Sequence, residues 1–220
     1  MMSLRWCYWL LVMVFYTPVL VAEAQLPKIA ADFETVVITG NQQQTYQWHF
    51  WRGDNFVETE NLNEHSGEAW TKSANGLISY QQISHSSQQI LDYLPADLDA
   101  IGLTLNWRGI ACLIDLQAFQ VTGEQMLFKQ KAIDYQQPSA DDLLEMTWLS
   151  NDQIPAFIKR SQQNYTQTTR LTALYPLAES PWPYQRSRNY QVIDFADIGD
   201  KEDDEFIKTM AHKIKGIHRH

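Results

Sequence analysis

The sequence predicts a mainly β (α+β) protein: one domain built on an antiparallel sheet, partly covered by a helical segment, with a C-terminal helix. Three features of the 220 residues predict it. Short runs with alternating apolar and polar side chains follow one another between residues 45 and 94. The apolar spacing becomes helical after residue 106, and strand-like runs resume beyond residue 123. No linker rich in Gly or Ser divides the chain, so we expect residues 25–220 to form a single domain.

The first strand-like runs predict a meander. Residues 46–50 alternate apolar and polar side chains, which is typical of a strand with one apolar face. Asn75-Gly76, between two further runs, predicts a type I′ hairpin turn, in which both central residues have positive φ. Consecutive strands joined this tightly must be antiparallel neighbours. The predicted strands of this part are 46–50, 56–60, 67–72, 77–83 and 89–94.

A helical segment is expected after the meander. Asn106 can cap a helix that runs through Trp107, Ile110, Ala111 and Ile114 and onward, because the apolar residues are spaced by three and four. We expect this helix to cover an open face of the sheet. The later strand-like runs are 126–128, 132–135, 144–149, 156–159, 168–175 and 190–195.

The end of the chain predicts a second helix, over residues 203–214. Acidic residues begin this segment and lysines end it, and that polarity suits the dipole of a helix. Its apolar residues form one helical stripe: Phe206, Ile207, Met210, Ala211 and Ile214.

The first 24 residues predict export through a cleaved signal peptide. Arg5 precedes an almost wholly apolar stretch, and Ala22-Glu23-Ala24 supplies the small residues that signal peptidase accepts. The alternative is an uncleaved membrane anchor, for which this stretch is marginal against the ~20 apolar residues that a spanning helix needs. We therefore expect no transmembrane segment to remain after cleavage.

Composition excludes some classes of function. The chain has 26 Asp and Glu against 17 Lys and Arg, and the formal charge of −9 repels a phosphate backbone. Nucleic acid is therefore not an expected partner. Of the two cysteines only Cys112 remains after cleavage, so no internal disulfide can form. Cys112 lies in an apolar run, where a buried and inert thiol is expected.

Short segments spread along the strands form a pattern that is found in a known family. They are Glu68-Ala69-Trp70, the Asn75-Gly76 hairpin, Tyr80, Gly123-Glu124, Ala132, Tyr135, Trp148 and Ile154-Pro155. With the succession of strands, interrupted once by a helical segment, this pattern resembles exported proteins of the lipoprotein-localisation (LolA/LolB-like) family, the outer-membrane lipoprotein-sorting type, over roughly three-quarters of the mature chain. The resemblance implies a periplasmic protein in which a strongly curved open sheet, or half-barrel, wraps a lid helix, with space between them for lipid acyl chains.

Five aromatic residues are the candidate ligand-binding residues: Trp48, Phe50, Trp70, Tyr80 and Tyr93. The strands that carry them should be neighbours, so one face of the sheet would bear an aromatic wall. Such a wall could line an apolar cavity for an acyl chain, or it could be ordinary core beneath the helix. Exposed indoles could also stack on sugar rings.

No catalytic, metal or cofactor site is expected. Residues 194–205 hold seven acidic side chains, but without the order of an EF-hand, and a solvated turn that caps the terminal helix accounts for them better than Ca²⁺ binding. The six histidines lack the spacing of a zinc site, and no nucleophile or phosphate-loop motif occurs.

These observations predict a binding module, not an enzyme. The primary hypothesis is an exported protein that carries or senses a lipid or acylated ligand in an apolar cavity between curved sheet and helix. The alternative is a structural or assembly protein of the cell envelope that acts through protein–protein contacts. The expected partner is accordingly an apolar ligand (a lipid or acyl chain) or an envelope protein.

Overall fold

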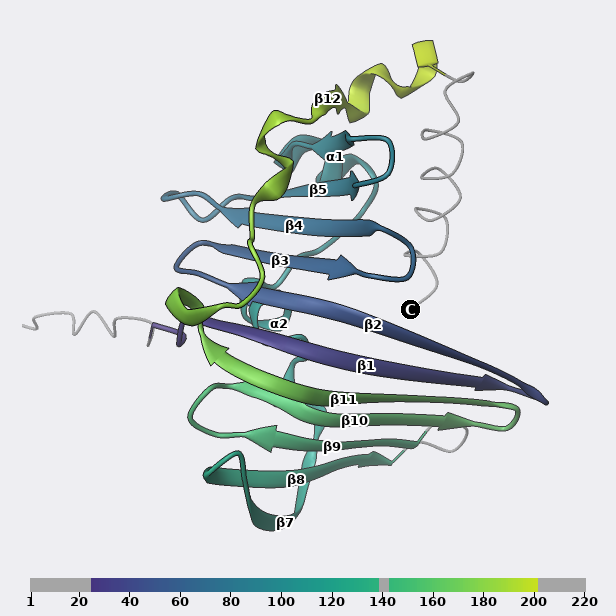
Figure 1. The fold of residues 1–220 in the computed structure, drawn as a ribbon, viewed down its shortest axis with the longest axis vertical. Helices are drawn as coiled ribbons and strands as arrows, with labels where there is room; N and C mark the ends of the chain where they lie inside the picture. The colour runs from purple at the N-terminus through teal and green to yellow at the C-terminus, as the bar shows by residue number, and fades with distance from the viewer. Residues whose placement is uncertain (1–24, 139–142, 202–220) are drawn as a thin grey trace, which may run out of the picture.

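The computed structural model describes residues 25–138 and 143–201. All strands of this part belong to one curved 12-stranded sheet with the order β12-β6-β5-β4-β3-β2-β1-β11-β10-β9-β8-β7 (Figure 1). This confirms the mainly β class, whereas the predicted signal peptide (1–24) and C-terminal helix (203–214) lie outside the described residues. The strands are β1 (Ile29–Thr39), β2 (Gln42–Arg52), β3 (Phe56–Asn61), β4 (Ser66–Lys72), β5 (Ile78–Ser84), β6 (Gln89–Tyr93), β7 (Gln120–Leu127), β8 (Gln130–Pro138), β9 (Leu143–Leu149), β10 (Ile154–Gln162), β11 (Tyr165–Pro176) and β12 (Gln191–Asp194).

The central strand is β1, which sequence analysis did not predict. It pairs antiparallel with β2 on one side and with β11 on the other, so it joins the two halves of the sheet. Three consecutive residues at its start, Ile29, Ala30 and Ala31, are buried. A strand with both faces covered does not alternate cleanly between apolar and polar residues, so it gives a weak period-two signal.

The meander from β2 to β6 is confirmed, since each strand pairs antiparallel with the next. The type I′ turn predicted between β4 and β5 is wrong. The Gly76 N–H donates to the Ser73 carbonyl at 2.9 Å, the Ser73 N–H donates to the Leu77 carbonyl at 2.9 Å, and positive φ at this turn is confined to Gly76. This pattern is a turn closed by a glycine bulge, a hairpin connection one residue longer than a type I′ turn.

The helical segment after β6 is more broken than predicted. Asn106 caps α2 (Trp107–Ala111) as expected, but the helix ends there and does not run onward. The reason is local: Leu113 adopts a left-handed backbone with φ of 66°, which stops the helix. A short α1 (Pro95–Ala100) precedes α2, and a 3-10 turn, η1 (Leu116–Ala118), follows it.

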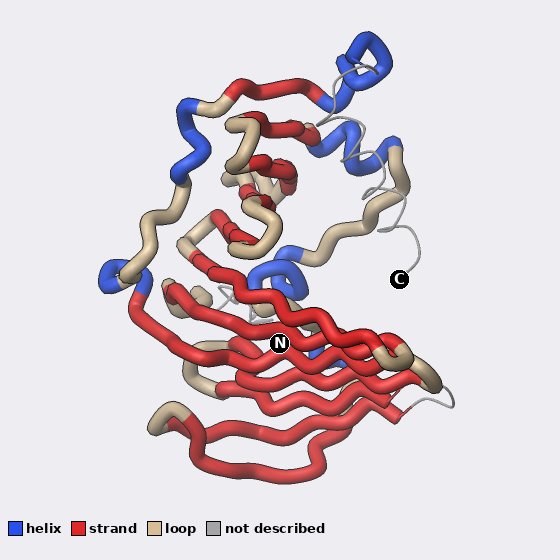
Figure 2. The backbone as a smooth tube through the Cα atoms, turned by 45° about the vertical axis from the view of Figure 1, so that its right-hand side comes forward, coloured by secondary structure: helices blue, strands red, loops and turns tan. Residues whose placement is uncertain are grey.

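We call the face of the sheet that packs against this segment the inner face. Leu98 of α1 packs with Leu91 of β6, and Ala111 of α2 packs with Phe50 and Val57 of β2 and β3. In Figure 2, α2 lies within the hollow of the curved sheet. The inner face therefore carries the main core, and α1 and α2 are held against it by apolar contacts.

The opposite, outer face is crossed by residues 177–190, which we call the strap (Figure 1). Trp182 of the strap stacks on His49 with ring centroids 4.9 Å apart, and Tyr184 stacks on Phe56 at 5.5 Å. The strap leads into β12, which pairs parallel with β6. The predicted antiparallel sheet therefore has one exception at this edge, because the strap brings the chain back to the residue level at which β6 starts, so that β12 runs in the same direction as β6.

Candidate ligand-binding site

The five predicted aromatic residues share the inner face but form two groups. In the first, Phe33 of β1 stacks on Trp48 with ring centroids 4.3 Å apart and meets the edge of Phe50 at 6.4 Å. The Trp48 indole N–H donates to the Thr35 hydroxyl at 3.0 Å. Phe50 is fully buried and Trp48 is half-buried. This group lies at the centre of the sheet, where β1 and β2 pair.

The second group lies nearer the β6 end of the sheet. Trp70 stacks on Tyr80 at 3.9 Å, Tyr80 lies 5.3 Å from Tyr93, and Phe195 stacks on Tyr93 at 4.6 Å. Tyr80 and Tyr93 are buried, and burial raises the pKa of both phenols well above the ordinary value. Trp70 remains half-buried and packs against both apolar clusters of the inner face.

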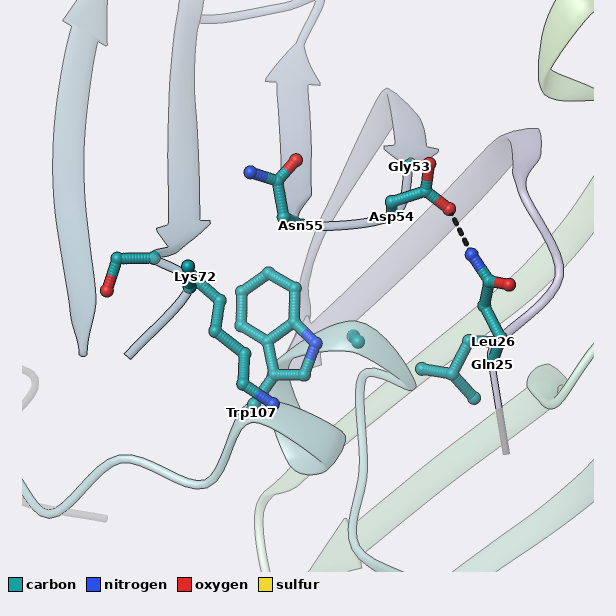
Figure 3. A pocket seen from close by; sticks show the side chains of 10 residues that line it. Gln25, Leu26, Gly53, Asp54, Asn55, Lys72 and Trp107 are labelled. Atoms are coloured by element: carbon teal, nitrogen blue, oxygen red, sulfur yellow. Dashed lines mark hydrogen bonds between the residues drawn. The ribbon is translucent and has the colours of Figure 1, made fainter. Parts of the chain in front are cut away.

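A cavity of about 570 Å³ opens beside these groups, where the β2–β3 turn, the β4–β5 turn and α2 meet. Its apolar walls come from Trp107, Leu26 and Ala111. In Figure 3 the Trp107 indole lies between Lys72 on one side and Leu26 on the other. None of the five predicted aromatic residues is among the ten that line it. The volume falls within the ~300–1,000 Å³ typical of small-molecule sites.

Charged and amide side chains surround the mouth of this cavity. The Asp54 carboxylate accepts hydrogen bonds from Lys28 Nζ and Gln25 Nε2, each at 2.5 Å. The hydrogen bond from Lys28 holds the pKa of Asp54 below its usual range, so the carboxylate stays ionised. Lys72 Nζ lies 6.0 Å from the centre of the Trp107 ring. The mouth is thus polar while the walls are apolar.

Arg52, the last residue of β2, holds the cavity wall in place. Its guanidinium is fully buried and donates to the backbone carbonyls of Pro27 at 2.8 Å, Ala111 at 2.9 Å and Gln153 at 3.0 Å, and to that of Asp152. Burial lowers its pKa from the usual value. One side chain of β2 therefore ties together the N-terminal segment, the end of α2 and the β9–β10 turn.

The structure also places the cysteine and part of the acidic stretch that the sequence singled out. Cys112 is buried as expected, and burial raises the pKa of its thiol, which disfavours the reactive thiolate. Within residues 25–138 and 143–201, no group of three or more His, Cys, Asp and Glu is placed to hold a metal. Of the acidic stretch, Asp194 accepts a hydrogen bond from the Ala196 N–H at 2.9 Å, as a turn residue does.

Acidic residues of β3 lie beneath the strap on the outer face. The Gln185 N–H donates to Glu58 Oε2 at 2.7 Å, and Arg186 pairs with Glu60. Desolvation raises the pKa of Glu58 to about 7, and the neighbouring Glu60 adds to the shift. At neutral pH the strap therefore rests on a carboxyl group that is only partly ionised.

The raised pKa of Glu58 predicts that stability falls as pH rises. The folded state holds this proton up to about pH 7, whereas the unfolded chain releases it near the ordinary value of 4.5. The folded state therefore binds more protons between these values, and unfolding becomes easier by on the order of 2 kcal/mol between pH 5 and pH 8. Urea unfolding across this range should show the slope, and Glu58→Gln should flatten it. The exposed Glu124→Gln is the matched control, and an equal slope in all three proteins would refute the assignment to Glu58.

Comparisons with known proteins give similarity of fold alone. No family model and no curated protein matches the chain. Among solved structures, an outer membrane lipoprotein-sorting protein domain from Vibrio parahaemolyticus has a TM-score of 0.36 at 5% identity, over 74% of this chain and 89% of that one. A LolA superfamily protein from Nitrosomonas europaea has a TM-score of 0.36 at 9% identity, over 71% and 88%.

MucB in its complex with MucA from Pseudomonas aeruginosa is also similar, with a TM-score of 0.36 at 10% identity, over 69% of this chain and 52% of that one. This chain therefore spans about half of the MucB structure. Two of these structures are thus of the lipoprotein-sorting and LolA type that the strand pattern of the sequence resembles. In the described residues no helix is long and apolar enough to cross a bilayer.

Proposed function

We propose that this chain is an exported, periplasmic binding protein that takes the acyl part of a lipid or acylated ligand into the cavity at Trp107. The observation that carries this proposal is the cavity itself, about 570 Å³ where the β2–β3 turn, the β4–β5 turn and α2 meet. Trp107, Leu26 and Ala111 supply apolar contact, which is what an acyl chain needs. The polar mouth leaves a head group in water.

Binding suits the polar residues of the cavity better than catalysis does. Asp54 is engaged by Lys28 and Gln25. The Ser73 hydroxyl contacts the Leu77 carbonyl at 2.9 Å and the side-chain oxygen of Asn75, so both of its hydrogen-bond partners belong to the turn itself. Nucleophilic catalysis needs a hydroxyl or thiol bonded to a general base, and these contacts give Ser73 no such base.

A second function is favoured by the free edge of the sheet. β7 is the last strand in the sheet order, and it pairs only with β8 among the described strands. Val121 and Met126 on this strand are 62% and 71% exposed. An exposed apolar edge strand can accept a strand from another protein, which is how an envelope assembly protein would act through this edge.

Extraction of the purified, exported protein distinguishes the two functions. Organic solvent extraction followed by mass spectrometry, alongside native mass spectrometry of the intact protein, identifies what remains bound. Co-purified lipid at one molecule per chain is the result expected of the carrier. A lipid-free protein that retains one stoichiometric protein partner would instead support action through β7.

Replacement of Trp107 by Ala should lower affinity for an acyl chain at least tenfold. Trp107 has the largest apolar side chain among the residues that line the cavity, and losing its contact removes on the order of 2 kcal/mol of apolar burial. Titration of dodecanoate, followed by isothermal calorimetry, measures the change. Trp182→Ala removes a 46%-exposed indole from the strap on the other face, and it should leave the affinity unchanged. Equal losses in both variants would show that the cavity is not the site.

A further inference from the structure

The predicted cleavage site coincides with the edge of the cavity. Cleavage after Ala24 makes Gln25 the first residue of the mature chain. Gln25 lines the cavity, and its side-chain amide bonds Asp54 at 2.5 Å (Figure 3). Export therefore creates a new α-amino group at the mouth of the cavity.

We propose that removal of residues 1–24 completes the ligand site. The α-ammonium of Gln25 becomes a third cation at the mouth, and the cavity then prefers amphiphiles with an anionic head group, a carboxylate or a phosphate. This inference rests on the proposed function, and it adds the chemical class of the head group.

The charge at the mouth has the sign opposite to that of the protein. Among the described residues at the mouth, Lys28, Lys72 and the α-ammonium give three positive charges and Asp54 gives one negative charge. An α-amino group has a pKa of about 7.7–8.0, so it is largely protonated at pH 7. The chain as a whole carries a formal charge of −9, so a positive mouth departs from the overall composition.

The geometry suits an amphiphile better than a wholly polar anion. Trp107 and Leu26 form the apolar wall, and Lys72 extends beside the same indole, 6.0 Å from its centre. A tail against the indole therefore brings its head group to the cations. In water, one charge at ~4 Å from an anion changes affinity about fivefold, so the three cations together outweigh Asp54.

The first test is the mass of the protein exported by a bacterial host from the full 220-residue sequence. A mass equal to residues 25–220 is the expected result. A mass that retains residues 1–24, or cleavage at another bond, overturns the inference, because no ammonium would then form at Gln25.

The second test compares dodecanoate, dodecyl phosphate and uncharged dodecanol, below micelle-forming concentrations, by calorimetry. Both anions should bind the mature protein at least tenfold more tightly than dodecanol. Glutaminyl cyclase then converts Gln25 to pyroglutamate: the α-amino nitrogen bonds to the side-chain carbonyl carbon and ammonia leaves. This removes the charge, and the affinity for the anions should fall about fivefold while that for dodecanol stays constant.

Gln25→Ser is the matched control, because it removes the side-chain amide and keeps the α-ammonium. It should retain the preference for anions. Equal binding of all three probes, or an unchanged preference after cyclisation, would overturn this inference and leave the proposed function intact. Failure of every probe to bind would refute the proposed function itself.

Discussion

Arg52→Met should lower the free energy of unfolding by about 3–5 kcal/mol, measured by urea titration of the mature protein. Arg52 is fully buried and bonds four backbone carbonyls in three segments of the chain. Methionine keeps the apolar stem of the side chain but supplies no donor, so buried carbonyls lose their partner. The wall of the cavity should loosen together with the fold, and dodecanoate affinity should fall as well.

Two further variants separate the effect of the buried guanidinium on stability from the effect of a positive charge alone. Arg52→Lys keeps a cation but cannot present donors in a planar fork, so we expect it to recover only part of the lost stability. Arg108→Met removes an exposed arginine that also bonds Gln153, through the side-chain oxygen at 2.7 Å. That variant should change stability by less than ~1 kcal/mol. If Arg52→Met lowered the free energy of unfolding as little as Arg108→Met, that result would contradict the role given to the buried guanidinium.

The parts of the fold that the sequence predicted are those with strong local signals. Residues 46–50 alternate because β2 has one apolar face along that stretch, and Asn106 caps α2 through a hydrogen bond two residues away. β1 lacked such a signal because Ile29, Ala30 and Ala31 are buried in succession. The parallel pairing of β12 depends on the strap, whose path across the outer face is set by contacts more than 120 residues apart in sequence.

The candidate site could likewise be predicted only where local sequence spacing determines it, and not where contacts between distant segments do. Period-two spacing was enough to place the five aromatic residues on one face. It could not show that Phe50, Tyr80 and Tyr93 would be fully packed, since that depends on α1, α2 and η4 (Phe195–Lys201). Arg52 continues the spacing of Trp48 and Phe50, and this could have placed it on the inner face. The Gly-Asp-Asn after it instead indicated a turn.

Trp70→Ala decides whether the aromatic wall belongs to the core or to the ligand site. Trp70 stacks on Tyr80 at 3.9 Å and packs against both apolar clusters of the inner face. Truncating a packed tryptophan costs about 3–5 kcal/mol, and the half-buried position of Trp70 favours the lower end, near 3 kcal/mol. Because Trp70 is not among the residues that line the cavity, its loss should leave dodecanoate affinity within about twofold of the original.

Urea unfolding and calorimetry of the same samples separate the two roles. Trp182→Ala provides the control for removing an indole outside the inner core, with an expected loss below ~1 kcal/mol. A Trp70→Ala protein that keeps its stability but loses dodecanoate binding would move the ligand from Trp107 to the aromatic wall. A protein that loses stability and retains affinity once folded would place Trp70 in the core, where its contact with Tyr80 joins the two clusters on which α1 and α2 pack.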